Sequence, residues 1–337
     1  MSAALVEVSG LSKSFPVRRG LFQSETAEFR AVDAVDLEIL KGETLALVGE
    51  SGSGKTTFAR CLLRLLEADS GSVSIAGEDL MAMSAQRLRQ QRRNFQMVFQ
   101  DPYGSLNPRM RVGEALAEPL AIHEVVPRRS RAKRVGELLD LVGLPGEVAA
   151  RFPHEFSGGQ RQRIAIARAL APEPGFLVAD EPVAALDGSV RAQILNVLSR
   201  LQEHLGLTLL LIAHDLVIVE QMADRVAILF LGRLVELAPS TALFANPLHP
   251  YTVNLLSCVP TPDPSVGLPA SVASEQPGRA IEMGPGCAFY ARCPVARDHC
   301  RTERPDLLEI QTGHEVACHY PGELEIGHPT RAGNGTF

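Results

Sequence analysis

The sequence predicts an α/β fold: a buried parallel sheet, a helical segment inserted into it, and a small irregular C-terminal extension that contains cysteines. Three observations lead to this prediction. Short runs of Val, Leu and Ile alternate with helical patterns over most of the chain. Between Pro102 and Phe156 helical spacing continues without a convincing strand, and from Pro239 onward Pro and Gly become frequent.

The predicted strands are short apolar runs bounded by Gly or charged residues. A run that is apolar on both faces suits a parallel sheet, because helices cover such a sheet on both sides. These runs are Thr44 to Val48, Phe95 to Phe99, Phe176 to Ala179, Thr208 to Ile212 and Arg225 to Phe230. In the inserted segment, apolar residues at helical spacing predict helices at Val112 to Ile122 and Arg131 to Val142.

The composition excludes several classes of protein. Of the 337 residues 45% are hydrophobic and 21% are charged, which is typical of a globular chain, and the net charge of -6 argues against a protein that coats nucleic acid. The longest apolar stretch, Leu205 to Ala213, falls well short of the roughly 20 residues that cross a bilayer. Because the N-terminus has no secretory pattern, we expect a cytosolic protein whose thiols stay reduced.

The residues after the first of these strands match a phosphate-binding loop. Gly49-Glu-Ser-Gly-Ser-Gly-Lys-Thr56 has the pattern G-x-x-x-x-G-K-[ST], with a strand before it and a predicted helix, Phe58 to Leu66, after it. In such a loop the backbone amides surround the β-phosphate, the Lys reaches the β- and γ-oxygens, and the Thr binds Mg²⁺. A Gly-rich turn that fits by chance would not explain the flanking strand and helix. The candidate nucleotide-binding residues are Gly49, Ser51, Gly52, Ser53, Gly54, Lys55, Thr56 and Thr57.

Two further elements point to phosphate chemistry. An apolar run ends in Asp180 and Glu181; these are placed to hold Mg²⁺ and to polarise an attacking water, although alone they would also fit a surface acidic pair. Ser157 is a predicted N-cap for the helix Arg161 to Leu170, and two glycines expose backbone amides at its positive end. Because this second anion site is remote in sequence from the first, we expect the two to meet between subunits. Its candidate residues are Ser157, Gly158, Gly159 and Gln160.

The Ser-Gly-Gly-Gln sequence resembles the signature of the ATP-binding cassette (ABC) ATPases, in which one subunit's signature closes over the γ-phosphate held by another. The resemblance implies an ABC-type P-loop nucleotide-binding fold with ATP and Mg²⁺ as ligands. It also implies a Q-loop glutamine at Gln100, a D-loop aspartate at Asp187, a switch histidine at His214 and an adenine-stacking aromatic at Phe15. The implied catalytic residues are Glu181, His214 and Gln100, and the implied Mg²⁺ ligands are Thr56, Gln100 and Asp180.

Several longer stretches are similar to one branch of the family, the ATPase subunits of dipeptide and oligopeptide importers. They are Gln100 to Pro108, His154 to Arg163, Asp180 to Asp187 and Pro247 to Thr252, with Phe156 and Val183 as in the F-type subunit. This resemblance implies an ATP-hydrolysing subunit that powers peptide import from the cytoplasmic face of the cytoplasmic membrane. The implied partners are a D-type ATPase, two permeases and, through them, an extracytoplasmic substrate-binding protein, with no nucleic acid. The alternatives are an importer of nickel or another solute and, further away, a soluble ABC ATPase without a transport role.

The resemblance and the patterning together divide the chain into three parts. We expect an ATP-binding α/β core at 1–101 and 166–245, a helical signature subdomain at 102–165, and a peptide-importer extension with a four-cysteine metal site at 246–337. The segment Arg18 to Arg30 is interpreted as an insertion between Phe15 and the rest of the core, and Pro260 to Pro285 as an irregular linker.

Four of the six cysteines lie in the last 51 residues, at Cys287, Cys293, Cys300 and Cys318. Their gaps of five, six and seventeen residues are not the C-x-x-C spacing of common zinc sites. The resemblance to peptide-importer ATPases, some of which hold a [4Fe-4S] cluster there, implies such a cluster. Zinc, a disulfide pair and free thiols remain as alternatives. For zinc, further ligands would be available at His299, His314 and His319, whereas Cys61 and Cys258 are interpreted as small packing residues.

Overall fold

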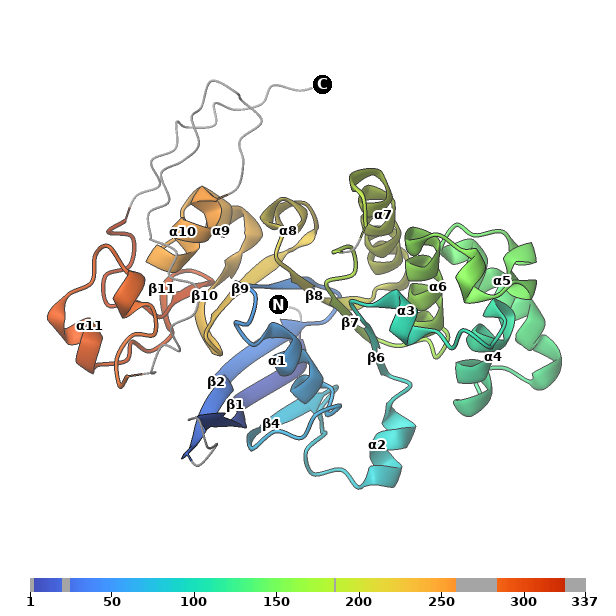
Figure 1. The fold of residues 1–337 in the computed structure, drawn as a ribbon, viewed down its shortest axis with the longest axis horizontal. Coiled ribbons are helices and arrows are strands. Elements are labelled where there is room, and N and C mark those ends of the chain that lie inside the picture. Colours follow the sequence, from blue (N-terminus) through green and yellow to red (C-terminus); the bar gives the residue numbers. More distant parts are fainter. Residues whose placement is uncertain (1–2, 20–24, 185, 259–283, 325–337) are drawn as a thin grey trace, which may run out of the picture.

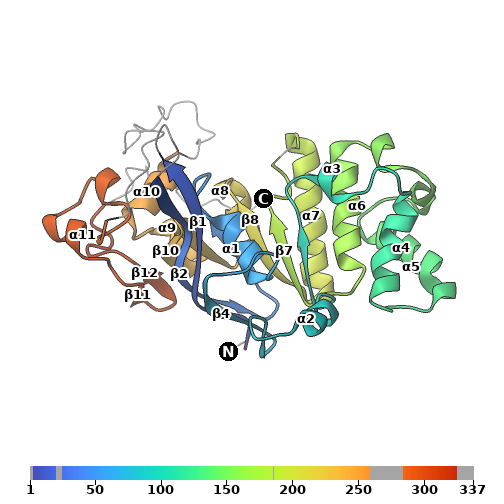
Figure 2. The same cartoon turned by 60° about the horizontal axis from the view of Figure 1, so that its bottom comes forward.

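The structure is a computed structural model that describes residues 3–19, 25–184, 186–258 and 284–324 (Figure 1). A central sheet separates two regions of the molecule. The helical segment lies at one end of this sheet and the C-terminal extension at the other, in both Figure 1 and Figure 2. The predicted site residues belong to elements that are far apart in the sequence, so these elements have to meet at the central sheet.

The main sheet has the strand order β11-β12-β10-β9-β3-β8-β7-β6. Its five parallel strands are β3 (Thr44–Val48), β6 (Phe95–Val98), β7 (Phe176–Asp180), β8 (Thr208–Ala213) and β9 (Arg225–Phe230). All five were predicted, and each end agrees within one residue. Parallel strands end at the same edge of a sheet, so Gln100, Asp180, Glu181 and His214 follow neighbouring strands at one edge.

Successive residues of the parallel strands face two separate cores. Leu45 and Leu47 of β3 pack with Phe58 of helix α1 (Lys55–Leu62) and with the antiparallel sheet. Ala46 and Val48 belong to the other core, which includes helices α4, α6 and α7. This alternation explains why the strands are apolar on both faces. The packing of Phe58 in the first core also fixes the position of α1, which follows the phosphate loop.

The antiparallel strands were not predicted from the sequence. The strands β1 (Ala4–Arg19), β2 (Glu25–Leu40), β4 (Ser70–Ile75) and β5 (Glu78–Asp79) form a second sheet in the order β2-β1-β4-β5. The described residues of the segment interpreted as an insertion belong to the β1–β2 ladder, in which Arg18 pairs with Thr26. These strands mix exposed polar with buried apolar positions, so no continuous apolar run marks them.

The inserted helical segment agrees with the prediction. Helices α4 (Val112–Ile122) and α5 (Arg131–Leu141) lie where they were expected, and the signature helix α6 (Gly158–Leu170) begins immediately after Ser157. The remaining helices of the described chain are α2 (Ala85–Gln91), α3 (Pro102–Ser105), α7 (Gly188–Leu205), α8 (Leu216–Met222), α9 (Ser240–Ala245), α10 (Pro250–Ser257) and α11 (Asp298–Thr302). Short 3-10 turns are η1 (Arg128–Ser130), η2 (Gly146–Ala150), η3 (Pro153–Glu155) and η4 (Tyr290–Arg292).

The C-terminal extension is more regular than expected. Strand β12 (His314–Val316) pairs with β10 (Arg233–Pro239), and β11 (Leu308–Gln311) pairs with β12, so the extension continues the main sheet. The expectation of an irregular tail was wrong on this point, because these strands are too short to show a pattern in the sequence. Most of the predicted linker, residues 260–283, lies outside the described residues.

Candidate active site

The phosphate loop joins β3 to α1, and its glycines are required by its geometry. Gly52 and Gly54 have φ angles of 81° and 106°, which favour glycine, and a Cβ on Gly54 would lie 2.0 Å from the carbonyl oxygen of Ala31. The backbone can therefore turn so that α1 begins at Lys55 with its N-terminus at the loop. This arrangement presents the positive end of a helix and free backbone amides to an anion.

Lys55 is folded back into the loop. Its Nζ donates to the carbonyl oxygens of Gly49, at 2.7 Å, and Glu50, at 2.9 Å. Burial lowers the pKa of Lys55, while the charges of Glu181, Asp180 and Glu50 oppose the shift. The side chain is thus a nearly buried ammonium that is held beside the carboxyl end of β7, where a phosphate would give it a better partner than the loop carbonyls.

The predicted Mg²⁺ ligands Thr56 and Asp180 lie together. The Thr56 hydroxyl donates to Asp180 Oδ1 at 3.0 Å, and Asp180 is 2% exposed at the end of β7. Burial raises the pKa of Asp180, and the hydrogen bond from Thr56 opposes this shift. A hydroxyl and a buried carboxylate at the mouth of a phosphate loop are a suitable pair of oxygen donors for Mg²⁺.

Two of the three predicted catalytic side chains, Gln100 and His214, contact one carboxylate oxygen of the third, Glu181. Gln100 Nε2 donates to Glu181 Oε2 at 2.9 Å, and His214 Nδ1 lies 3.4 Å from the same oxygen. Glu181 has a φ of 44°, which is unusual for a residue with a side chain and is typical of positions constrained by function. The sheet therefore brings Gln100, Glu181 and His214, which are 114 positions apart at the extremes, into one cluster beside Lys55.

The signature residues form a separate group. Ser157 and Gln160 cap α6 reciprocally, through Gln160 N to Ser157 Oγ at 3.4 Å and Ser157 N to Gln160 Oε1 at 3.1 Å. Asp187 caps α7 in the same way, by accepting from the backbone of Val190 at 3.0 Å. Figures 1 and 2 place α6 among the helices at one end of the sheet, while α1 lies near its middle. The two predicted phosphate-binding elements of the chain therefore lie in different parts of the fold.

The remaining predicted nucleotide-binding residues lie in the phosphate loop, in α1 and on β1. Ser53 is buried, Thr57 is half-buried in α1, and Ser51 is exposed at the tip of the loop. Phe15 is 36% exposed on β1, directly opposite Phe29 of β2, which is 46% exposed. The sequence analysis named Phe15 and missed Phe29, because only the pairing of the two strands reveals that both aromatic rings share a face.

The C-terminal extension touches the phosphate loop, which the sequence analysis did not foresee. The Tyr251 hydroxyl accepts a hydrogen bond from the backbone N–H of Glu50, and Arg292 forms an ion pair with the Glu50 carboxylate. Glu50 occupies a variable position of the loop pattern, so its identity carries no signal. The Pro-Tyr pair of α10 was noted as part of a motif, but no contact for it was predicted.

Comparisons with known proteins agree with this geometry. A family model described as "ABC transporter" matches residues 32–184, and one described as "Oligopeptide/dipeptide transporter, C-terminal region" matches residues 235–300. The chain is similar to the "Probable peptide ABC transporter ATP-binding protein y4tS" of Sinorhizobium fredii, with 47% identity over 97% of this chain and 93% of the relative. It is also similar to the "Oligopeptide transport ATP-binding protein AppF" of Bacillus subtilis, with 45% identity over 94% of this chain and 97% of the relative.

A solved structure shows the same fold. It is the dimeric ATP-binding cassette MJ0796 in a post-hydrolysis state bound to ADP and Pi. The match covers 70% of this chain and 98% of that chain, with a TM-score of 0.62 and 29% identity. The chain belongs to the ABC transporter ATPases. Within that family, its relatives and its C-terminal region are those of the peptide and oligopeptide ATP-binding proteins, as expected. Across the described ranges, no helix has the length and apolar character needed to cross a membrane.

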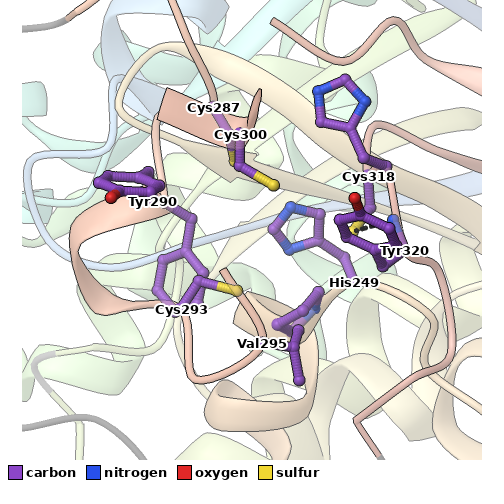
Figure 3. Close-up of a pocket in the computed structure, with 11 residues that line it drawn as sticks. His249, Cys287, Tyr290, Cys293, Val295, Cys300, Cys318 and Tyr320 are labelled. Atoms are coloured by element: carbon purple, nitrogen blue, oxygen red, sulfur yellow. Dashed lines mark hydrogen bonds between the residues drawn. The ribbon is translucent and has the colours of Figure 1, made fainter. Parts of the chain in front are cut away.

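The four clustered cysteines line one hollow in the extension. Cys287, Cys293, Cys300 and Cys318 surround it together with His249, and Figure 3 shows their side chains around a common space. Burial raises the pKa of Cys287 and Cys293, and raises that of Cys318 to about 12. Within the described parts of the chain, no three His, Cys, Asp or Glu side chains are arranged to hold a metal ion. The arrangement therefore does not by itself support the predicted cluster or zinc.

The alternatives for the cysteines are also narrowed. All six cysteines are free, so the disulfide alternative is wrong for this structure. His314 is no candidate ligand, because its Nε2 lies 2.7 Å from Glu236 Oε1 within the sheet and the side chain is buried. Cys61 is a fully buried packing residue as expected, whereas Cys258 is exposed at the end of α10 and does not fill the core.

Proposed function

We propose that the chain is the ATP-hydrolysing subunit of an ABC importer of peptides. The observation that supports this most directly is the cluster of Gln100 and His214 around one oxygen of Glu181, beside Lys55. This is a carboxylate that is held by two polar neighbours at the place where the γ-phosphate of ATP would lie. The peptide branch rests on the match of residues 235–300 and on the names of the relatives.

In this proposal each side chain of the loop and sheet edge has a distinct task. Lys55 exchanges the carbonyls of Gly49 and Glu50 for phosphate oxygens, and the amides of the loop hold the β-phosphate. Thr56 and Asp180 would hold Mg²⁺, which neutralises charge on the phosphate oxygens. Glu181 orients and polarises the attacking water, and His214 contacts the γ-phosphate. Phe15 stacks on the adenine.

The signature residues act on a second ATPase subunit. Ser157 and Gln160 use their own backbone amides to cap their helix and lie apart from Lys55, so we infer that the amides of Gly158 and Gly159 at the same helix N-terminus meet a phosphate held by a partner. The similar MJ0796 cassette is described as dimeric. We infer that the partner is a D-type ATPase and that isolated chains hydrolyse ATP weakly or not at all, because each site is completed by the other subunit.

We infer that a permease segment docks in a hollow next to Gln100. It has a volume of about 290 Å³ between β6 and α4, and its lining includes the exposed side chains of Phe99 and Ile122. Because Gln100 follows Phe99 directly, a permease segment in this hollow would move the glutamine that contacts Glu181. We also propose two permeases as partners, with the chain peripheral on the cytoplasmic face of the membrane and a substrate-binding protein on the other side; this part rests on the similarity to peptide transporter ATP-binding proteins.

The proposed division of the chain follows these tasks: 1–101 and 166–245 bind ATP, 102–165 present the signature, and 246–337 form the importer extension. We also propose that the four thiols of the extension are the ligand set of a [4Fe-4S] cluster. This rests on the number of cysteines that line one hollow, and iron binding would have to draw their thiols together, because no three of them are arranged to hold a metal ion among the described residues. Metal analysis after anaerobic purification tests this. About four irons per chain are expected, whereas one zinc or no metal would contradict the inference.

The function is tested with Glu181→Gln in the transporter reconstituted with its co-encoded partners. The variant should bind ATP as the wild type does and lose at least about 100-fold in turnover, because the amide cannot act as the base for water. Glu78→Gln is the matched control, since Glu78 is a surface glutamate that pairs with Arg87 at 3.0 Å. Unimpaired hydrolysis by Glu181→Gln would remove Glu181 from its role, and ATP turnover without peptide uptake would favour another solute.

A further inference from the structure

Three separate groups hold one residue of the phosphate loop, Glu50. Its carbonyl oxygen accepts from Lys55, its backbone N–H donates to the Tyr251 hydroxyl at 2.8 Å, and its carboxylate receives Arg292 in a two-pronged pair at 2.9 and 2.6 Å. Tyr251 and Arg292 both belong to the C-terminal part of the chain, about 200 positions or more from the loop in sequence. The extension therefore contacts both the backbone and a side chain of the phosphate loop.

The side chains of Tyr251 and Arg292, which contact Glu50, are both held in place by their neighbours. His249 Nδ1 accepts from the backbone of Tyr251 at 3.0 Å and so caps α10, while Tyr251 itself is fully buried. The Tyr251 ring lies 4.5 Å from Phe230 and 5.5 Å from Phe289, centroid to centroid. An aromatic cluster of this kind restricts the hydroxyl to one position, because the ring cannot move without opening the core.

Arg292 is fixed by the same cluster. Its guanidinium lies 5.6 Å from the ring of Phe230 and 5.5 Å from that of Phe289, within the range of a cation–π contact. The hydrogen bonds that Arg292 donates to the Glu50 carboxylate raise the pKa of Arg292, so the guanidinium stays charged. A planar fork that is stacked on two rings meets a carboxylate in one orientation only, which a lysine could not reproduce.

The location of Arg292 links the loop to the cysteine hollow. Arg292 directly precedes Cys293, and Phe289 and Cys293 both line the hollow. A displacement of this short segment would therefore move the guanidinium that holds Glu50. The amides of the phosphate loop bind phosphate only when the backbone points inward, so the position of Glu50 affects how well the loop is preorganised.

We propose that Arg292 is a positioning residue for ATP binding, which acts through Glu50 to hold the phosphate loop in its binding conformation. This inference rests on the proposed function, and it gives the C-terminal extension a task at the nucleotide site. The pair is partly exposed, with 26% of the Arg292 and 38% of the Glu50 side chain accessible. An exposed pair of this kind contributes little to global stability, so its effect should appear in ATP affinity rather than in unfolding.

The test measures the dissociation constant of Mg-ATP for the full chain. Arg292→Met should bind ATP about fivefold more weakly, and Arg292→Lys should recover part of the loss. Arg297→Met is the matched control, because Arg297 also pairs with a glutamate, from its Nη2 to the two carboxylate oxygens of Glu323 at 2.9 and 2.6 Å, and stacks on Tyr320. Arg297 is remote from the loop in its contacts, so its variant should bind ATP as the wild type does.

Two further readouts separate positioning from a structural role. Glu50→Gln should weaken ATP binding as Arg292→Met does, and the double variant should be no weaker than either single one, since both remove one interaction. In the assembled transporter, Arg292→Met should raise the KM for ATP and leave kcat at saturating ATP unchanged.

The outcomes are distinct. Wild-type affinity in Arg292→Met, equal losses in Arg292→Met and Arg297→Met, or additive losses with Glu50→Gln would each overturn the inference and leave the proposed function intact. A wild-type chain that binds no ATP would overturn both.

Discussion

Replacing Gly159 with alanine probes the packing of the signature helix on α7. A Cβ at this position would lie 2.1 Å from Cγ1 of Val190, closer than carbon atoms approach without a shift. Gly158, its neighbour, has space by comparison: a Cβ there would lie 3.3 Å from Cδ2 of Leu186, which is the end of a flexible side chain. The two adjacent glycines of one motif therefore differ in what they tolerate.

The magnitude follows from two opposing effects. Alanine favours a helix over glycine by up to about 1 kcal/mol, less in the first turn, whereas overpacking typically costs about 1–3 kcal/mol. We expect Gly159→Ala to lower the free energy of unfolding by about 1–2 kcal/mol on balance. Gly158→Ala should leave it within about 0.5 kcal/mol of the wild-type value.

Urea unfolding of the full chain, together with ATPase activity of the assembled complex, measures this effect. Val190→Ala removes the clashing Cγ1 and leaves the Val190 Cβ position at 3.5 Å, an ordinary contact, so combining it with Gly159→Ala should recover most of the stability that the single variant loses. If Gly159→Ala were as stable and active as the wild type, or if Val190→Ala gave no rescue, the packing argument would be refuted.

Three other predictions concern Asp33, Glu236 and Phe15. Asp33→Asn should destabilise the chain by about 1–3 kcal/mol at pH 7. Burial raises the pKa of Asp33, but hydrogen bonds from Arg30 and Arg233 outweigh this effect and lower the pKa below its ordinary 3.8. The stabilisation by the carboxylate is thus present above that value and lost as the pH falls through the lower, folded-state pKa, so denaturation curves should show a constant gap from pH 5 to 8 that narrows below about pH 4. Glu236→Gln should lower the free energy of unfolding by about 2 kcal/mol in urea, because its buried carboxylate accepts from three donors and an amide nitrogen would face one of them; a neutral result would contradict this. Phe15→Ala should weaken ATP binding about tenfold by loss of stacking without a comparable change in stability, and equal affinity would remove Phe15 from the nucleotide site.

The parallel part of the fold was predictable because each of its strands is buried on both faces. Runs such as Phe176 to Ala179 have no competing pattern, and the phosphate loop adds a fixed spacing of glycines. The β1–β2 hairpin was not predictable in this way. Its strands alternate buried apolar with exposed polar residues, as in Val35-Asp-Leu-Glu-Ile39, so no continuous apolar run marks them. The sequence around Phe15 and Phe29 also gives no sign that the two rings face the same side of one ladder.

The site divides in the same manner. Lys55, Asp180 and Glu181 follow from local motifs, whereas Gln100 and His214 were implied by the resemblance to ABC ATPases. Their convergence is a property of parallel strands, whose carboxyl ends meet at one edge of the sheet. The contacts of Glu50 with Tyr251 and Arg292 depend on how the extension packs against the loop. Such long-range pairs leave no periodicity or spacing in the sequence, and only the tertiary structure reveals them.

The strands that the extension adds to the main sheet also change where that sheet stops. Without β12, the outermost strand would be β10, seven mostly buried residues whose unpaired backbone groups would invite strand exchange with other molecules. With the extension in place, the last strand is β11, which has only four residues, all of them exposed, including Glu309. A short strand with a charge is a poor template for further pairing, so we expect the extension to make the subunit less prone to aggregate through its sheet edge.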